Sequence, residues 1–189
     1  MDIQVKDINE GQPVPEHFAF GVYDPDNHMA LGRNLNPEVS WSGVPEGTRS
    51  FVVMIKDPDV PSEAGDVNQE GRTVSKKIPR VDFYHWLLVD VPPTVARIEE
   101  GKESNGVVPK GKSPSKDALG KRGINDYTDF LAGDPELAGT YAGYDGPCPP
   151  WNDERLHHYH VTVYALDVPT LGLPEDGAFT GDDVRKALD

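Results

Sequence analysis

Three runs of apolar residues, separated by polar and proline-rich segments, dominate the pattern along the chain. Residues 51–56 are largely apolar, residues 83–91 stop at two prolines, and residues 159–166 alternate apolar and polar positions most clearly. Runs of this length, with a period of two, are typical of β-strands. Two weaker candidates lie at residues 19–22 and 38–41. We therefore expect three principal strands, the last two of them neighbours in an antiparallel sheet.

The rest of the chain is predicted to contain mainly loops. Residues 62–80 and 99–129 show no apolar period and are expected to form long surface excursions. Residues 134–138 are expected to form one helical turn, and Thr180 is expected to cap a final helix over residues 182–188. Strands joined without regular helical crossovers favour an all-β fold, an antiparallel β-sandwich of two sheets with a few short helices. No repeat or boundary divides residues 1–189, so we expect a single domain.

Composition narrows the functional classes. The 19 glycines and 18 prolines favour a loop-rich β protein. The net charge of −14 disfavours nucleic acid and anionic membrane surfaces as partners, because both would be repelled. The single cysteine, Cys148, cannot form an internal disulfide, and the sequence contains neither a signal peptide nor a transmembrane run. We expect a cytoplasmic protein with no integral membrane association.

Polar side chains fall on the apolar face of each principal strand. Because side chains alternate between faces along a strand, Asp57, His85 and His157 all have the parity of a core-facing position. By the same rule, His85 shares its face with Leu87 and Val89. If the first strand pairs antiparallel with the other two, its end lies beside both their starts. The three polar groups would then meet at one rim of the core.

Two catalytic interpretations of these residues remain open at this point. Cys148 and His157 would suit a cysteine hydrolase, which needs a base beside the thiol and a lowered thiol pKa. A cysteine between prolines is, however, more often a small packed residue. Asp57, His85 and His157 would suit a metal-dependent enzyme, since these residue types bind zinc. Their spacing is diffuse, and the adjacent His157 and His158 point to opposite faces of a strand.

Three motifs, in this order, resemble those of a known family. They are Asp57-Pro-Asp-Val-Pro61, His85-Trp-Leu-Leu-Val89, and Gly146-Pro-Cys-Pro-Pro150 followed by His157-His-Tyr159. Together they are similar to the signatures of the phosphatidylethanolamine-binding protein family, in its prokaryotic Raf-kinase-inhibitor-like branch. The resemblance extends over about residues 18–173. It implies a β-sandwich of two antiparallel sheets with a small anion-binding pocket at one end.

The resemblance also implies which side chains form that pocket. The ligand-binding residues would be Asp57, Asp59, His85, Pro149, His157 and Tyr159, with Pro61, Trp86 and Cys148 as walls. The sequence departs from the family in two places. Leu156-His157-His158 stands where Gly-His-Arg is usual, so an ion pair of that arginine is in question, and residues 151–156 form a slightly longer segment than usual.

The expected function is recognition of a small anion or a phosphorylated head group, with no catalysis and no cofactor. Imidazole and loop N–H groups would donate to anion oxygens, and the proline-rich turns would keep their geometry fixed. Binding should strengthen as the pH falls from about 8 to about 6, through protonation of His157. Regulation of a kinase or peptidase through the loops is the second hypothesis, and we expect a homodimer.

Overall fold

Antiparallel strands make up most of the regular structure of the computed structural model, which describes residues 1–189. Strands account for 32% of the residues and helices for 8%, which confirms the expected β-rich fold. The larger sheet has the strand order β10-β5-β6-β9-β8, and the smaller one the order β1-β4-β7. The larger sheet contains β5 (Ser50–Pro61), β6 (Arg80–Val91), β8 (Ser115–Asp117), β9 (Gly120–Arg122) and β10 (His160–Leu166). The smaller sheet contains β1 (Asp2–Val5), β4 (Val39–Ser42) and β7 (Arg97–Ile98).

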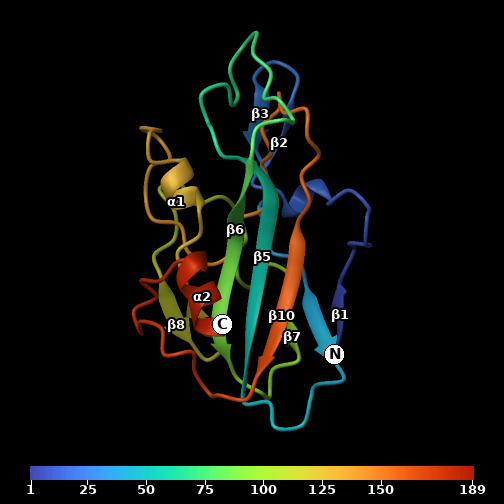
Figure 1. The fold of residues 1–189 in the computed structure, drawn as a ribbon, viewed down its shortest axis with the longest axis vertical. Coiled ribbons are helices and arrows are strands. Elements are labelled where there is room, and N and C mark those ends of the chain that lie inside the picture. Colours follow the sequence, from blue (N-terminus) through green and yellow to red (C-terminus); the bar gives the residue numbers. More distant parts are fainter.

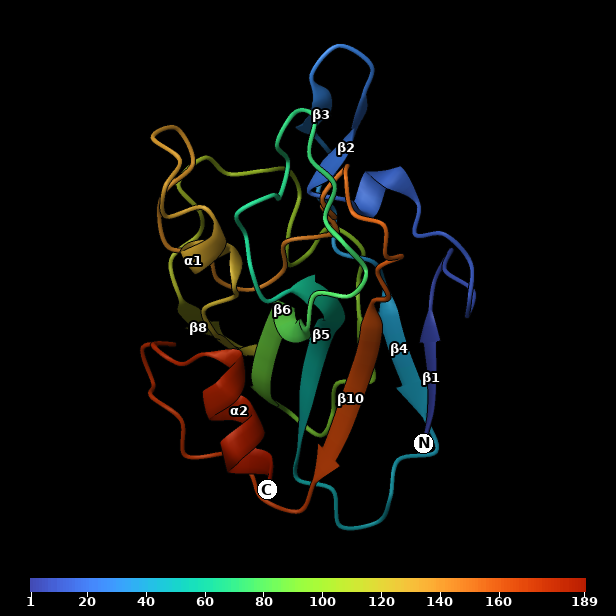
Figure 2. The same cartoon turned by 45° about the horizontal axis from the view of Figure 1, so that its top comes forward.

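The main hydrophobic core lies between these two sheets. Alternate residues of β5 and β6 point into it and meet side chains of β4 and β7. The buried members are Val39, Trp41, Phe51, Val53, Ile55, Trp86, Leu88, Val91, Ile98, Tyr144 and Val163. Figure 2 shows β1 and β4 beside β10, on the far side of the sheet from the C-terminal helix. The predicted face of the first strand is therefore confirmed as the core face.

The opposite face of the larger sheet is covered by helix α2 (Gly181–Leu188). Figure 1 shows this helix beside β6. Val184 of the helix and the preceding Phe179 pack against Leu87 and Val89 of β6. Thr180 caps the helix as predicted, because its hydroxyl accepts from the Asp183 N–H while the Asp183 carboxylate accepts from the Thr180 N–H. Both faces of the central parts of β5 and β6, residues 50–55 and 84–89, are thus buried.

The central position of β5 explains how distant segments meet. It pairs antiparallel with β6 on one side and with β10 on the other, so β6 and β10 are not neighbours and that expectation was wrong. The antiparallel pairing of the first strand with both others is confirmed. The end of β5 consequently lies beside the starts of β6 and β10, where the functional residues were expected.

Strand β5 also continues further than the sequence indicated, through Pro61 rather than ending before Asp57. Two prolines fit in this extension because β10 begins only at His160, opposite Lys56. Beyond that point β5 has no partner on its β10 side, and prolines are tolerated on such an edge. Register shifts relative to β6 follow Ile55 and Asp57.

The remaining elements are short. A hairpin of β2 (Gly21–Asp24) and β3 (His28–Leu31) stands apart from both sheets, and η1 (Glu16–Phe18) precedes it. The predicted turn at 134–138 is present as a single helical turn, closed by the Ala138 N–H to Asp134 carbonyl hydrogen bond of 2.8 Å, and helix α1 (Tyr127–Phe130) precedes it. The segment 99–129, expected as a surface excursion, contains β8 and β9 and buries Glu103 and Lys121.

Candidate functional site

A small cavity of about 70 Å³ opens where the end of β5 meets the starts of β6 and β10. Helix α1 and the proline-rich segment 148–150 complete its walls. The lining residues are Asp57, Val60, Pro61, Ala64, Val67, Phe83, His85, Tyr127, Phe130, Cys148, Pro149, Pro150, His157 and Tyr159. More than half of these are apolar, and the polar ones come from three separate strands or strand ends.

The structure brings most of the predicted site residues to this cavity. Asp57, His85, Pro149, His157 and Tyr159 line it, and so do the predicted wall residues Pro61 and Cys148. Two predicted residues do not line it. Trp86 is completely buried in the core between the sheets, and Asp59 points its carboxylate towards the segment 155–158.

His85 reaches the cavity through a β-bulge. Ile55 pairs with Trp86 and the next residue, Lys56, pairs with Tyr84, so His85 is an extra residue in its strand. Simple alternation would place it with Leu87 and Val89, which pack under α2. The bulge instead turns its imidazole to the side of Asp57. The prediction that His85 shares a face with Leu87 and Val89 was therefore wrong, although the three polar groups do meet.

His157 is held between two buried carboxylates. Its Nδ1 lies 2.6 Å from Asp57 Oδ2, and its Nε2 lies 3.2 Å from Asp153 Oδ2. Burial by itself lowers the pKa of His157, but the hydrogen bonds and charges of the two carboxylates outweigh burial and raise it above the ordinary value. Both ring nitrogens are thus directed at protein oxygens, and the imidazolium form is favoured.

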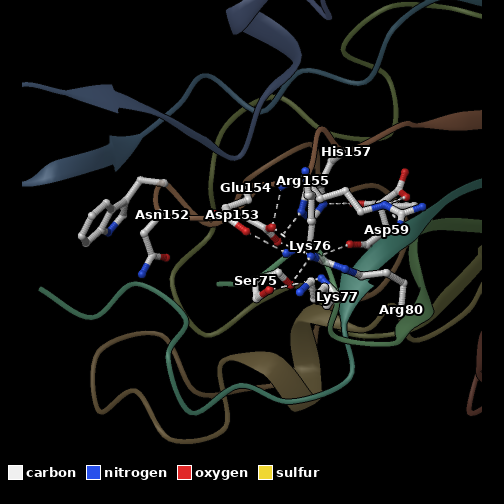
Figure 3. Close-up of polar contacts among 12 residues, drawn as sticks. Asp59, Ser75, Lys76, Lys77, Arg80, Asn152, Asp153, Glu154, Arg155 and His157 are labelled. Carbon is white, nitrogen blue, oxygen red and sulfur yellow. Dashed lines mark hydrogen bonds and ion pairs between the residues drawn. The ribbon is translucent and has the colours of Figure 1, made fainter. Parts of the chain in front are cut away.

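Arg80 is the second cationic partner of Asp153, which therefore lies between the side chains of His157 and Arg80 (Figure 3). Its Nη1 lies 2.5 Å from Asp153 Oδ2 and its Nη2 lies 3.0 Å from Oδ1. The Arg80 side chain is only 5% exposed and that of Asp153 only 1%. Burial acts to raise the pKa of Asp153. The hydrogen bonds from Arg80, the largest of the opposing causes, help to lower it overall. We call Arg80, Asp153, His157 and Asp57 the charge chain.

Asp59 has two partners of its own, Arg155 and His158. Both lie in residues 151–158, where the sequence departs from the family motif. Asp59 Oδ1 accepts from Arg155 Nε at 2.6 Å, and its Oδ2 lies 2.7 Å from His158 Nδ1. Burial acts to raise the pKa of Asp59, but the bonds from His158 and Arg155 lower it overall. Arg155 and His158 thus both pair with Asp59, and Arg155 lies three residues before the position at which the resemblance led us to expect an arginine.

His85 is neutral and has one free nitrogen. Its Nδ1 lies 2.9 Å from the carbonyl oxygen of Asp145, so this nitrogen must carry the proton. Burial is the main cause that lowers the pKa of His85 to about 4. The ring is in edge contact with Tyr159, with centroids 5.3 Å apart. Its Nε2 makes no hydrogen bond within the protein, and as the unprotonated nitrogen of a residue that lines the cavity it can only accept one.

The hydroxyl of Tyr159 has no hydrogen-bond partner although it is buried. The other buried tyrosines near the cavity are satisfied. Tyr127 donates to the Gly146 carbonyl at 2.6 Å and Tyr144 donates to the Phe18 carbonyl at 2.7 Å. An unsatisfied buried hydroxyl costs about 1–3 kcal/mol and is rare in folded proteins. Among the side-chain oxygen and nitrogen atoms of the lining residues, those without a partner are therefore Tyr159 Oη and His85 Nε2.

The geometry does not favour the two catalytic interpretations. Burial raises the pKa of Cys148 to about 11, and its sulfur makes no hydrogen bond to His157. His157 has no free nitrogen to act as its base. No group of three or more histidine, cysteine, aspartate or glutamate side chains is arranged to hold a metal ion.

Sequence reasoning missed several residues of the site. Tyr127 and Phe130 line the cavity, and neither was predicted from the sequence to belong to it. Asp153 and Arg80 were missed because they lie 73 residues apart and because Asp153 lies outside any helix or strand. The insertion at 151–156 was the available signal, since it supplies both Asp153 and Arg155.

Comparisons with known proteins agree with this geometry. A sequence model described as phosphatidylethanolamine-binding protein matches residues 4–189. The chain belongs to the phosphatidylethanolamine-binding protein family. No helix in the protein has the length and apolar character needed to cross a bilayer.

Family relatives are similar along most of this chain. The Escherichia coli protein YbcL is 32% identical over 152 residues, which are 79% of this chain and 61% of YbcL. YbhB of the same organism is 28% identical over 188 residues, covering 98% of this chain and 91% of YbhB. The crystal structure of YbcL, described as a member of the mammalian family, superposes with a TM-score of 0.64 at 26% identity, covering 98% of this chain and 87% of that one.

A first prediction concerns Cys148. Because its thiol is protonated at neutral pH and has no adjacent base, the wild-type protein should release no burst of product from activated esters. Cys148→Ala should give the same trace in stopped-flow absorbance with a nitrophenyl ester. A stoichiometric burst that disappears in Cys148→Ala would contradict this assignment.

A second prediction follows from the lowered pKa of His85. The unfolded chain takes up this proton near pH 6.5 and the folded protein only near pH 4. The stability contributed by neutral His85 is thus complete above about pH 6.5 and falls as the pH drops towards 4, by up to about 3 kcal/mol. Urea unfolding across this range should show wild type losing stability relative to His85→Asn. Exposed His160→Asn is the control, and parallel profiles of wild type and His85→Asn would refute the assignment.

Proposed function

We propose that the cavity binds the phosphoryl group of a small phosphorylated ligand, as recognition without catalysis. The observation that carries this proposal is the buried hydroxyl of Tyr159, which has no partner and belongs to a residue that lines the same cavity as His85. Ligand oxygens would satisfy both atoms. The free energy lost by leaving the hydroxyl unpaired in the free protein would be regained on binding.

Electrostatics supports an anionic ligand of low charge. His157 is the one cationic side chain that lines the cavity, and no lysine or arginine does. Its N–H groups face Asp57 and Asp153, so it would attract an anion through its charge rather than by direct donation. The net charge of −14 favours capture of a soluble ligand over binding to an anionic bilayer.

The apolar part of the wall supports a ligand with a small organic group attached to the phosphoryl. Val60, Pro61 and Val67 form one side, and Pro149 and Pro150 form another. Prolines restrict the backbone before binding, which reduces the entropy lost when a ligand is held. Asn152 fixes these walls together, since its Nδ2 donates to the Asp66 carbonyl at 2.8 Å and to the Arg72 carbonyl at 3.1 Å.

The sequence-based expectations about location and assembly stay predictions. Regulation of a kinase or peptidase is not favoured by any particular contact, so we confine the proposal to the small ligand and to a cytoplasmic setting. The homodimer is tested directly by light scattering at micromolar concentration. Twice the mass of the 20.7 kDa chain is expected, and a monomeric mass would overturn it.

The central test of the proposed function is Tyr159→Phe. Removing an unpaired hydroxyl should leave the free energy of unfolding unchanged or raise it by about 1 kcal/mol. Affinity for phosphoethanolamine should fall about tenfold, because one hydrogen bond to the phosphoryl is lost. Calorimetric titration and urea unfolding measure the two effects separately.

Tyr144→Phe provides the matched control for this test. Its hydroxyl is bonded to the Phe18 carbonyl and does not line the cavity. That substitution should reduce stability by about 1 kcal/mol and leave affinity unchanged. If Tyr159→Phe behaved like Tyr144→Phe, the hydroxyl of Tyr159 would not be a ligand group, and the proposal would lose its main support.

A further inference from the structure

The backbone fixes the protonation site of His85 by a reciprocal contact. Asp145 N–H donates to the His85 carbonyl at 2.9 Å, and His85 Nδ1 lies 2.9 Å from the Asp145 carbonyl. A carbonyl oxygen can only accept, so the proton of the neutral ring stays on Nδ1. Nε2 therefore presents a lone pair to the cavity and needs a donor from the ligand.

The side chain of Asp145 makes this arrangement rigid. It is completely buried, and its carboxylate accepts from Asn34 Nδ2 at 2.8 Å and from Asn125 Nδ2 at 2.9 Å. Lys112 Nζ lies 3.2 Å from the same carboxylate and also donates to the Tyr144 carbonyl. The Asp145 carbonyl cannot rotate away from His85 without breaking this network, so the tautomer is set by the fold.

The other groups that face His85 offer it no proton. From β5, Asp57 uses Oδ1 to accept from Asp59 N–H at 2.7 Å and Oδ2 to accept from His157. From α1, Tyr127 donates to the Gly146 carbonyl, and the Cys148 thiol makes no hydrogen bond. The imidazolium of His157 has both nitrogens directed at carboxylates. Tyr159 is unpartnered and is not bonded to the ring.

We propose that the cavity selects the singly protonated form of a phosphomonoester. The proposal rests on the proposed function and specifies its ligand. The P–OH group would donate to Nε2 of His85, and an ionised phosphoryl oxygen would accept from the hydroxyl of Tyr159. A dianion, a phosphodiester or a sulfate ester has no such proton. Each would place an anionic oxygen against the lone pair of His85 and near the carboxylate of Asp57.

Selection for the protonated ligand has a pH signature of its own. The second ionisation of a phosphomonoester has a pKa of about 6. Affinity for total phosphoethanolamine should therefore fall as the pH rises above about 6, approaching tenfold per pH unit. The expected source of the dependence is the proton of the ligand, because Asp57 and Asp153 raise the pKa of His157 and favour its charged form already in the free protein.

The test is a calorimetric comparison of three ligands at about pH 6. Phosphoethanolamine is the phosphomonoester and glycerophosphoethanolamine is the diester. Ethanolamine O-sulfate carries one negative charge on its sulfate group, as the singly protonated phosphate does, but has no acidic O–H. The sulfate should bind at least about tenfold more weakly than the phosphate, because His85 Nε2 would lose its donor. Sulfate binding should also lack the decline above pH 6.

His85→Gln is the informative variant, since its terminal amide can present either a donor or an acceptor to the ligand. It should bring the affinities for phosphate and sulfate esters within about threefold of each other, while His160→Gln should keep the wild-type ratio. Equal wild-type affinities for the two esters would overturn the selection and leave the proposed function intact. Failure of all three ligands to bind would refute the proposed function together with the selection.

Discussion

The pairing of buried carboxylates at the end of β5 is the constraint on which the site depends. Asp57 and Asp153 are almost fully buried, and an unpaired buried charge would cost several kcal/mol. Both are neutralised by His157 and Arg80, which come from segments far apart in the sequence. The pairing therefore fixes where the segment 150–157 lies relative to β5 and β6. That position in turn creates the cavity.

A division of roles follows from this constraint. The charged groups that a sequence motif marks most clearly, Asp57 and His157, are satisfied by each other and by neighbouring protein atoms. They shape the cavity and set its charge. The groups left for a ligand are less conspicuous, namely the neutral ring of His85 and the hydroxyl of Tyr159. Membership of the phosphatidylethanolamine-binding protein family is consistent with a binding role for such a cavity.

Alternation of apolar residues was sufficient to predict the three principal strands, and the motifs pointed to most of the cavity wall. Alternation failed at His85 because a bulge depends on the register with the partner strand, which no single-strand pattern records. The family resemblance was wrong about Trp86, which packs in the core between the sheets and does not line the cavity. The partners of Asp57, Asp59 and His157 depend on irregular segments brought together only by the tertiary fold.

The protonation states of the two histidines test this account most directly. Nitrogen-15 NMR of the imidazole rings at about pH 7 separates protonated from lone-pair nitrogens, with assignment through single His→Gln variants. The account predicts a neutral His85 protonated at Nδ1 alone and a His157 protonated at both nitrogens. A His85 that carries its proton on Nε2 or on both nitrogens would contradict it, because the cavity would then offer a ligand a donor instead of a lone pair.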